Sequence, residues 1–448
     1  MNIQLSDHFS FGKLLKFTFP SIIMMVFTSI YGVVDGLFVS NFAGKSAFAA
    51  INLILPYIMM FGTIGIMVGT GGAALVSMTL GAGDHPRANT IFSQLVYFSL
   101  ICGVAMSVIG IALLRPVSIW MGAEGEMIEL CVQYGRFTLP AMAAFILQNA
   151  FQSLCVAAEK PNLGLGLTVA AGVTNIVLDA LFVGVFGWGL IGAAVATSLS
   201  QCVGGLVPLL YFSRKNSSLL RLTKAKIEGR VLLRTCTNGS SELMSNLSLS
   251  IVNMLYNLQL MKYAGEDGVA AYGVIMYVNF IFIAVFLGYS IGVAPVIGYH
   301  HGAENHTELR GVYRKSLVII GVMALILTVA AELLAGPLSR IFVSYDAALL
   351  EMTVRAFRIY ALSFLVSGIS IFGSSFFTAL NNGLISAAIS FLRTLLFQTA
   401  AVLLLPLIFD LEGIWYSILV AEAISAGLTV LCFLLFRKKY HYGREVAA

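Results

Sequence analysis

Apolar runs long enough to cross a lipid bilayer follow one another along almost the whole chain, and they constrain its fold more than any other feature. A membrane-spanning helix needs about 20 consecutive, mostly apolar residues. Twelve runs meet this requirement, and they cover approximately residues 14–40, 49–78, 91–114, 136–158, 163–186, 190–212, 233–261, 269–298, 316–336, 356–380, 384–408 and 413–436. Because the runs are continuous and not alternating, helices fit them better than the strands of a barrel. We therefore predict an all-α integral membrane protein with twelve transmembrane helices.

Charged residues are scarce, and most of the basic ones fall on one side of the predicted membrane. Only 10% of the residues are charged, whereas soluble globular chains have about 25%. If the N-terminus is cytoplasmic, most of the 26 lysines and arginines lie in cytoplasmic loops, among them Lys13, Arg87, Arg214 and Lys438. The positive-inside rule then places both termini in the cytoplasm. The net charge of +5 follows from this orientation, and we expect no nucleic-acid partner.

The second half of the chain repeats the first with a constant shift of 221 residues. The matched positions are Ala49-Ala50 with Ala270-Ala271, Gly81-Ala82 with Gly302-Ala303, and Gly192 with Gly413. Each half holds six predicted helices, an even number, so both halves should enter the membrane with the same orientation. We expect a pseudo-twofold axis along the membrane normal to relate them, as in transporters built from parallel repeats.

The repeat divides the chain into an N-terminal six-helix lobe, residues 1–213, and a C-terminal six-helix lobe, residues 231–448. Residues 214–230 between the lobes carry six lysines and arginines. We expect a basic cytoplasmic linker here, and contact with anionic lipid headgroups is the alternative. Two similar bundles favour a transporter in which one lobe rocks against the other.

Two aspartates, Asp35 and Asp179, interrupt the apolar runs. A carboxylate near the centre of a bilayer costs roughly 2.5–3.5 kcal/mol on insertion scales, so such a residue usually faces a protein interior and has a function. Both aspartates and Thr197 are about seven or eight residues from the outer ends of their predicted helices, which places them about 10–12 Å below the outer surface. The three side chains could therefore meet in the outer half of the N-terminal lobe.

Each aspartate has a polar residue four positions before it on the same helix face, Asn175 for Asp179 and Tyr31 for Asp35. Carboxylate, amide and hydroxyl oxygens are suitable ligands for Na⁺, and they also form hydrogen bonds with a protonated acid. Burial beside a second carboxylate favours that protonated form. We therefore predict a site for Na⁺ or H⁺ coupling. The alternative is a pair of structural acids that hold helices together.

Other residues in the apolar runs suggest a bend and a substrate cavity. Pro20 lacks a backbone donor and could bend the first helix, although a static kink is equally consistent. Met24 and Met60 could line an adaptable pocket, and ordinary helix packing explains them as well. Glu242, near the inner end of the seventh run, is a weaker candidate for this cavity. Glu422 lies well inside the last run.

The chain resembles the multidrug and toxic compound extrusion (MATE) family, and within it the bacterial and archaeal branch of DinF-like and MepA-like exporters. The motifs that carry the resemblance are Tyr31-x-x-x-Asp35, Ala49-Ala50, Gly81-Ala82-Gly83-Asp84, Asn175-x-x-x-Asp179 and Trp188-Gly189-x-x-Gly192-Ala193-Ala194. The resemblance implies two six-helix lobes around a central cavity, and export of organic cations driven by inward flow of Na⁺ or H⁺. It also implies a bacterial or archaeal cytoplasmic membrane.

The family's cation site consists of an aspartate in helix 1, an asparagine and an aspartate four residues apart in helix 5, and a threonine in helix 6. Asp35, Asn175, Asp179 and Thr197 match these positions. MepA-like members can carry an acid in helix 8, and that place holds Ile291 here. Glu242 is the nearest acidic substitute in the same lobe.

These observations predict a cation-coupled multidrug antiporter that works by alternating access. Its expected partners are small organic cations and membrane lipids, its coupling ion is Na⁺ or H⁺, and we expect a monomer without a cofactor. No nucleotide-binding motif is present in the sequence, so direct use of ATP is not expected. The first alternative is a lipid-linked sugar flippase, which a long positively charged cavity would favour; few cationic residues lie well inside the predicted spans, Arg393 being the exception. The second alternative is a membrane enzyme, for which we find no catalytic cluster.

Overall fold

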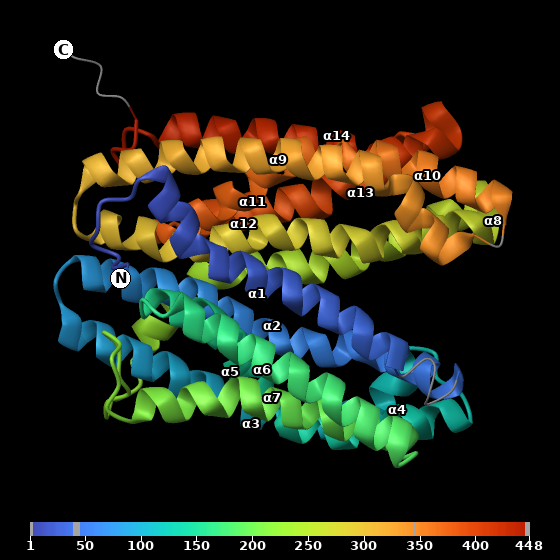
Figure 1. The fold of residues 1–448 in the computed structure, drawn as a ribbon, viewed down its shortest axis with the longest axis horizontal. Coiled ribbons are helices and arrows are strands. Elements are labelled where there is room, and N and C mark those ends of the chain that lie inside the picture. Colours follow the sequence, from blue (N-terminus) through green and yellow to red (C-terminus); the bar gives the residue numbers. More distant parts are fainter. Residues whose placement is uncertain (1–2, 39–44, 345, 444–448) are drawn as a thin grey trace.

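The protein is described by a computed structural model that covers residues 3–38, 45–344 and 346–443, without the side chains of residues 33, 35–38, 45 and 48. Long helices run side by side in this part of the chain (Figure 1). The first half contains α1 (Phe11–Phe38), α2 (Lys45–Gly81), α3 (His85–Trp120), α4 (Glu126–Thr138), α5 (Met142–Ala157), α6 (Pro161–Asp179) and α7 (Gly189–Ser213). The second half contains α8 (Gly229–Gly302), α9 (His306–Val343), α10 (Ala347–Ala361), α11 (Phe364–Ala379), α12 (Gly383–Phe391), α13 (Gln398–Leu404) and α14 (Pro406–Phe436).

Short helical segments of another kind join some of these helices. The 3₁₀ segment η2 (Leu139–Ala141) connects α4 to α5, and the π-helical segments η3 (Ala180–Val185) and η4 (Leu392–Phe397) extend α6 and connect α12 to α13. The fourth, fifth and eleventh predicted spans each contain one of these segments. The chain therefore crosses the bundle there without leaving a helical path.

The described residues provide twelve membrane spans. Ten helices are long and apolar enough to cross a membrane, and α10 and α11 together form an eleventh span that is bent by 48°. The helix α8 has a break at Gly265, whose backbone angles of φ 63° and ψ −150° suit a residue without a side chain. Counted as two spans on either side of this break, α8 brings the number to twelve, and the predicted fold class is confirmed.

Two glycines show the pseudo-twofold relationship between the halves directly. A Cβ atom on Gly81 would collide with the backbone carbonyl of Tyr299, and a Cβ atom on Gly302 would collide with the backbone carbonyl of Met78. Gly302 and Tyr299 are the positions equivalent to Gly81 and Met78 after the shift of 221 residues. The contact between α2 and α8 is therefore reciprocal, as at an interface formed around a twofold axis.

The helix starts next to these glycines repeat in the same way. The Asp84 side chain caps α3 by accepting a hydrogen bond from the backbone N–H of Arg87, and the Asn305 side chain caps α9 by accepting one from Glu308. The residue numbers of the two capping residues differ by 221, and so do those of the two residues that donate to them. The matching geometry accounts for the repeat of capping residues in these turns, since a helix N-terminus needs a side-chain oxygen for its free N–H groups.

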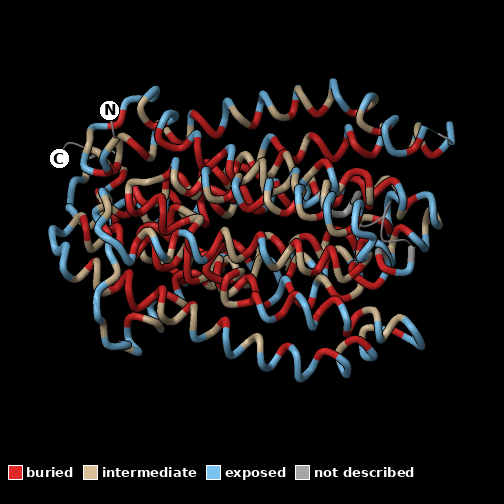
Figure 2. The backbone as a smooth tube through the Cα atoms, turned by 60° about the horizontal axis from the view of Figure 1, so that its bottom comes forward, coloured by how far each residue is buried: buried red, intermediate tan, exposed pale blue. Residues whose placement is uncertain are grey.

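Burial separates inner helices from outer ones. In α3 and in α9, 28% of the most apolar 18-residue stretch is buried inside the protein. In the span formed by α4 and α5, the corresponding share is 72%. Exposed residues accordingly follow the outer helices in Figure 2. The apolar outer surfaces of α3 and α9 are suited to contact lipid.

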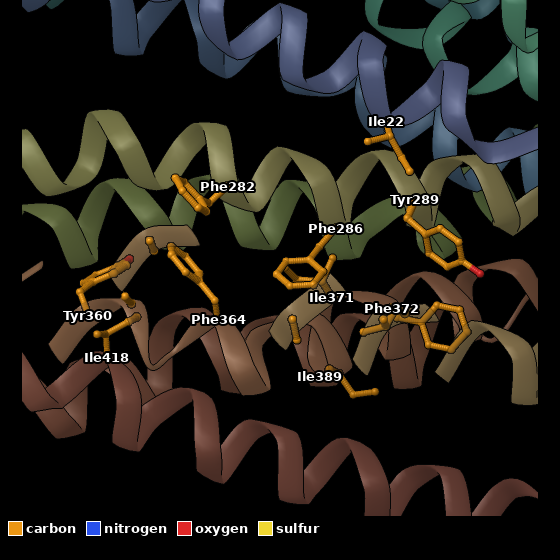
Figure 3. Packing of buried hydrophobic residues seen from close by; sticks show 14 of the residues in the cluster. Ile22, Phe282, Phe286, Tyr289, Tyr360, Phe364, Ile371, Phe372, Ile389 and Ile418 are labelled. Atoms are coloured by element: carbon orange, nitrogen blue, oxygen red, sulfur yellow. The ribbon is translucent and has the colours of Figure 1, made fainter. Parts of the chain in front are cut away.

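Aromatic residues fill the core of the second half (Figure 3). The rings of Phe282 and Phe364 are stacked with their centroids 5.2 Å apart, and the hydroxyl of Tyr289 forms a 2.9 Å hydrogen bond with Ser316. Ile22 of α1 packs into the same cluster. The first helix of one half thus contributes to the core of the other.

Candidate functional site

The helix α6 carries the acid and the amide of the predicted cation site in its last two turns. Asn175 is 2% exposed and Asp179 is fully buried, so the four-residue spacing does place both on the inner face of α6. Asp35 lies in α1, but its side chain is outside the described residues. The relation between the two carboxylates therefore stays a prediction.

Neighbouring helices hold Thr197 and Tyr31. Thr197 is on α7 and Tyr31 is on α1, and both helices contact α6. Tyr31 packs against Gly172 of α6, next to Phe27, whose ring centroid is 5.9 Å from that of Tyr31. The helix α6 is thus packed against two other helices that carry predicted site residues, α1 and α7.

Two polar atoms at this site are buried without a hydrogen-bond partner among the described residues. They are the Nδ2 atom of Asn175 and the Oγ1 atom of Thr197. A buried polar group that lacks a partner is destabilising by about 1–3 kcal/mol. The Oγ1 atom of Thr197 is a hydroxyl oxygen that can ligate a small hard cation such as Na⁺, whereas the Nδ2 atom of Asn175 is a hydrogen-bond donor that needs an acceptor such as a water or a carboxylate oxygen.

The helix widens directly after Asp179. The segment η3 (Ala180–Val185) is π-helical and ends just before the turn to α7. Segments of this kind are rare and are found frequently at functional sites. The sequence gives no pattern that would have revealed it.

The remaining candidate residues of the first half lie in different surroundings. Pro20 is inside α1, which continues as one helix from Phe11 to Phe38. Met24 is 1% exposed with its sulfur 3.7 Å from the Cβ position of Gly164, whereas Met60 is 43% exposed. Neither methionine is in the wall of the central cavity described next, whereas the neighbouring Met25 is part of that wall.

A cavity of about 350 Å³ lies between the two halves. Its wall combines residues of α1, α2 and α5 with many more of the second half, and it includes Glu242, Ile291, Tyr256, Tyr272 and Arg393. The volume is in the range of small-molecule sites. The wall does not include Asn175, Asp179 or Thr197, so the predicted cation site and this cavity are separate places among the described residues.

Glu242 brings a carboxylate to this wall. It is partly exposed on α8, and among the described residues its carboxylate has neither an ion pair nor a hydrogen bond. The charge of Arg393 acts on it from within the same wall, without direct contact. An acid in this position can attract an organic cation.

Arg393 and Glu422 form a buried ion pair in the second half. The Nε atom of Arg393 donates to both carboxylate oxygens of Glu422, at 3.0 and 2.9 Å, and Glu422 is 2% exposed. Arg393 is in the π-helical segment η4, which corresponds to η3 as part of the fifth helix of its half. Both residues lie within predicted spans, but no local sequence pattern predicts their pairing.

Twelve spans in two related halves around a central cavity are the architecture of a secondary transporter. The MatE family pattern matches residues 20–181 and 243–402, more than half of the chain. The chain belongs to the MatE family. It is therefore a transporter, and the membrane-enzyme alternative is excluded.

Relatives of known kind align along nearly the full chain. Multidrug export protein MepA of Staphylococcus haemolyticus (strain JCSC1435) is 25% identical over 432 residues, which are 96% of this chain and 94% of that protein. Multidrug export protein MepA of Staphylococcus aureus (strain MRSA252) is 23% identical over 432 residues, with the same coverage.

Solved structures share the fold. The outward-facing conformation of a multidrug resistance MATE family transporter of the MOP superfamily has a TM-score of 0.92 at 23% identity, and the alignment covers 99% of each chain. MATE in the straight conformation has a TM-score of 0.92 and in the bent conformation 0.89, both at 23% identity. The alignments cover 97% of this chain in both cases, and 98% and 97% of the other chain.

Proposed function

We propose that this protein is a multidrug efflux transporter that exports small organic cations in exchange for Na⁺ or H⁺. The observation that carries the proposal is the central cavity with Glu242 in its wall, where the carboxylate has no ion pair among the described residues. A carboxylate exposed to a cavity within a membrane favours a positively charged guest. The multidrug export activity of the MepA relatives supports the same substrate class.

The coupling ion binds in the N-terminal lobe, at Asp35, Asn175, Asp179 and Thr197. Asp179 supplies negative charge, while the Asn175 and Thr197 side chains supply oxygens for Na⁺ or hydrogen bonds for a protonated acid. Because this site and the cavity are separate, ion and substrate compete through conformation and not by direct exclusion. Each ligand then lowers the affinity of the protein for the other by the same factor.

The transport cycle is alternating access. The ion enters from outside and stabilises the conformation that releases substrate, the lobes rock, and the ion leaves inside. Pro20 lies below the ion site on α1 and gives this helix a place to bend. The protein works as a monomer in a bacterial or archaeal cytoplasmic membrane, surrounded by lipid, with both termini in the cytoplasm.

The flippase alternative needs a long cationic cavity, and the described wall does not favour it. Arg393 is a cationic residue of this wall, and its Nε atom is engaged by the carboxylate of Glu422. With Glu242 nearby, the wall contains more acidic than basic groups.

Efflux from proteoliposomes tests the proposal. The full-length protein is reconstituted into proteoliposomes, and these are loaded with the cationic dye rhodamine 123. A Na⁺ gradient or a pH gradient is then imposed across their membrane, each alone. We expect efflux under at least one gradient, and a loss of at least about tenfold in Asp179→Asn, because an amide carries no charge for the ion. Asp267→Asn, an exposed aspartate of α8 without an ion pair among the described residues, is the control. Efflux that responds to neither gradient would refute the antiporter.

A further inference from the structure

The ion pair between Arg393 and Glu422 leaves most of the arginine unused. Arginine has five N–H donors, and the hydrogen bonds with Glu422 use only the one on Nε. Among the described residues, neither Nη atom of Arg393 has a hydrogen bond or ion pair. The residue is partly exposed, and what it faces is the central cavity.

This orientation does not suit a residue that only neutralises a buried acid. An arginine that pairs with a carboxylate for that purpose commonly presents two N–H groups side by side, one to each oxygen. Here Nε alone reaches both oxygens of Glu422, and Gln398 adds a weak contact at 3.5 Å. Glu422 therefore holds the guanidinium plane of Arg393 in place, and the Nη edge of Arg393 remains available to bind another group.

The local backbone supports a function for this group. Arg393 lies in η4 (Leu392–Phe397), a π-helical segment about halfway along the span from Gly383 to Leu404. A π-helical turn at mid-membrane depth is uncommon in a helix with only a packing role, and such turns occur often at functional sites. A fixed cation at this depth is itself an indication of function.

The same cavity wall offers partners for the rest of a substrate. Glu242 presents an acid, and the rings of Tyr256 and Tyr272 are stacked with centroids 5.1 Å apart. The wall therefore combines a negative group, a positive group and a flat aromatic surface. Such a set is complementary to a planar molecule that carries both charges.

We propose that the Nη edge of Arg393 is a binding point for the carboxylate of a zwitterionic organic substrate, whose ammonium group faces Glu242. This inference deepens the proposed export function, on which it rests for its substrate. It makes Arg393 a residue that distinguishes substrates with a carboxylate from substrates without one. The anionic group binds through two parallel N–H bonds, for which the guanidinium edge has the right shape.

Binding of a matched dye pair tests the proposal without depending on transport. Rhodamine 110 has a free carboxylate, and rhodamine 123 is its methyl ester, so the pair differs only in the group that Arg393 would bind. Fluorescence anisotropy of the full-length protein in detergent gives both Kd values. We expect the wild type to bind the acid at least as tightly as the ester.

The variant Arg393→Gln with Glu422→Gln removes both charges together, because a single change would leave a buried charge without its partner. We expect the ratio of the two Kd values to shift against the acid by about tenfold or more. Arg393→Lys, which keeps the charge but not the two-pronged edge, should give a smaller shift in the same direction. Arg136→Gln, an exposed arginine of α4, is the control.

The proposal is overturned if the double variant elutes as folded protein and keeps the wild-type ratio, or if the wild type binds neither dye. It is also overturned if farnesyl diphosphate displaces rhodamine 110 at far lower concentration than benzoate does, since a lipid-linked phosphate would then be the better ligand. A protein that shows the expected ratio but does not export rhodamine 123 in proteoliposomes refutes the exporter alone.

Discussion

Arg87 and Glu308 are equivalent positions of the two repeats, and the side chain of each contacts the segment that leads into the other half. Arg87 in α3 binds Glu228, the residue before α8, with Nη1–Oε1 and Nη2–Oε2 distances of 2.6 and 2.8 Å. Glu308 in α9 binds His8, which precedes α1. The repeat has thus kept the contact although the residue types at both positions differ.

Reversal of both charges tests whether the first of these pairs joins the halves. Arg87→Glu alone places two acids together, and Glu228→Arg alone places two bases together, so each should lower the Tm of the purified protein. The double variant restores the attraction in the opposite direction and should recover most of the loss. Differential scanning fluorimetry in detergent measures all four proteins. Additive losses in the double variant would show that the two residues do not interact.

The same pair gives the stability a defined dependence on pH. Hydrogen bonds from Arg87 and then Gln94 lower the pKa of Glu228 from 4.5 to about 2. A carboxyl group with a lower pKa in the folded protein stabilises it above the unfolded pKa, and this contribution disappears as the pH falls toward the folded value. The Tm difference between wild type and Glu228→Gln should therefore be constant above about pH 5 and shrink between pH 4.5 and 2. A difference that grows on acidification would contradict the assignment.

The reciprocal glycine contact predicts sensitivity to one added carbon. Gly81→Ala would press Cβ against the carbonyl of Tyr299, and Gly302→Ala would do the same to Met78, so the backbones of α2 and α8 must separate. Overpacking of this kind destabilises by about 1–3 kcal/mol. Thermal unfolding measures the loss. Gly166→Ala in α6, where a Cβ meets nothing within 4 Å, should be neutral or slightly stabilising.

Thr197→Val tests the hydroxyl at the predicted ion site while it keeps the side-chain shape. If Oγ1 contacts the ion, the concentration of Na⁺ or H⁺ that gives half-maximal efflux should rise about tenfold, in line with the loss of one hydrogen bond to a charged group. The fold should be unaffected, because this atom has no partner among the described residues. Thr174→Val, at a partly exposed position of α6 where the hydroxyl donates to the Ala170 carbonyl, is the control. An unchanged half-maximal concentration would remove Thr197 from the site.

The apolar runs predicted the spans well because a bilayer imposes one simple requirement on each of them. The fourth span is one exception. It begins at Glu126, about ten residues before the predicted start, because Glu129 and Arg136 interrupt the apolar pattern there. Glu129 forms a 2.8 Å ion pair with Arg115 of α3, a contact between distant residues that no local pattern announces.

The site was predictable only where its residues share a helix. The four-residue spacing of Asn175 and Asp179 places both side chains inside the protein, as expected. The contact of Arg393 with Glu422 joins two helices, and the π-helical turn that carries Arg393 has no signature in composition. Met24 and Met25 show a further limit, since adjacent residues point about 100° apart around a helix and only the structure shows which one borders the cavity.

The segment between α7 and α8 lies along α3 and is fastened to it. Backbone N–H groups of Arg221 and Thr223 donate to Asn89 and Ser93, and the Tyr97 hydroxyl donates to the Thr223 carbonyl. Because these hydrogen bonds hold the connecting segment against α3, a large movement of the second half relative to the first would have to bend the chain where the hydrogen bonds end, at Glu228 and Gly229. A cross-link that immobilised these two residues would then stop the relative movement of the two halves and leave the structure of each half intact.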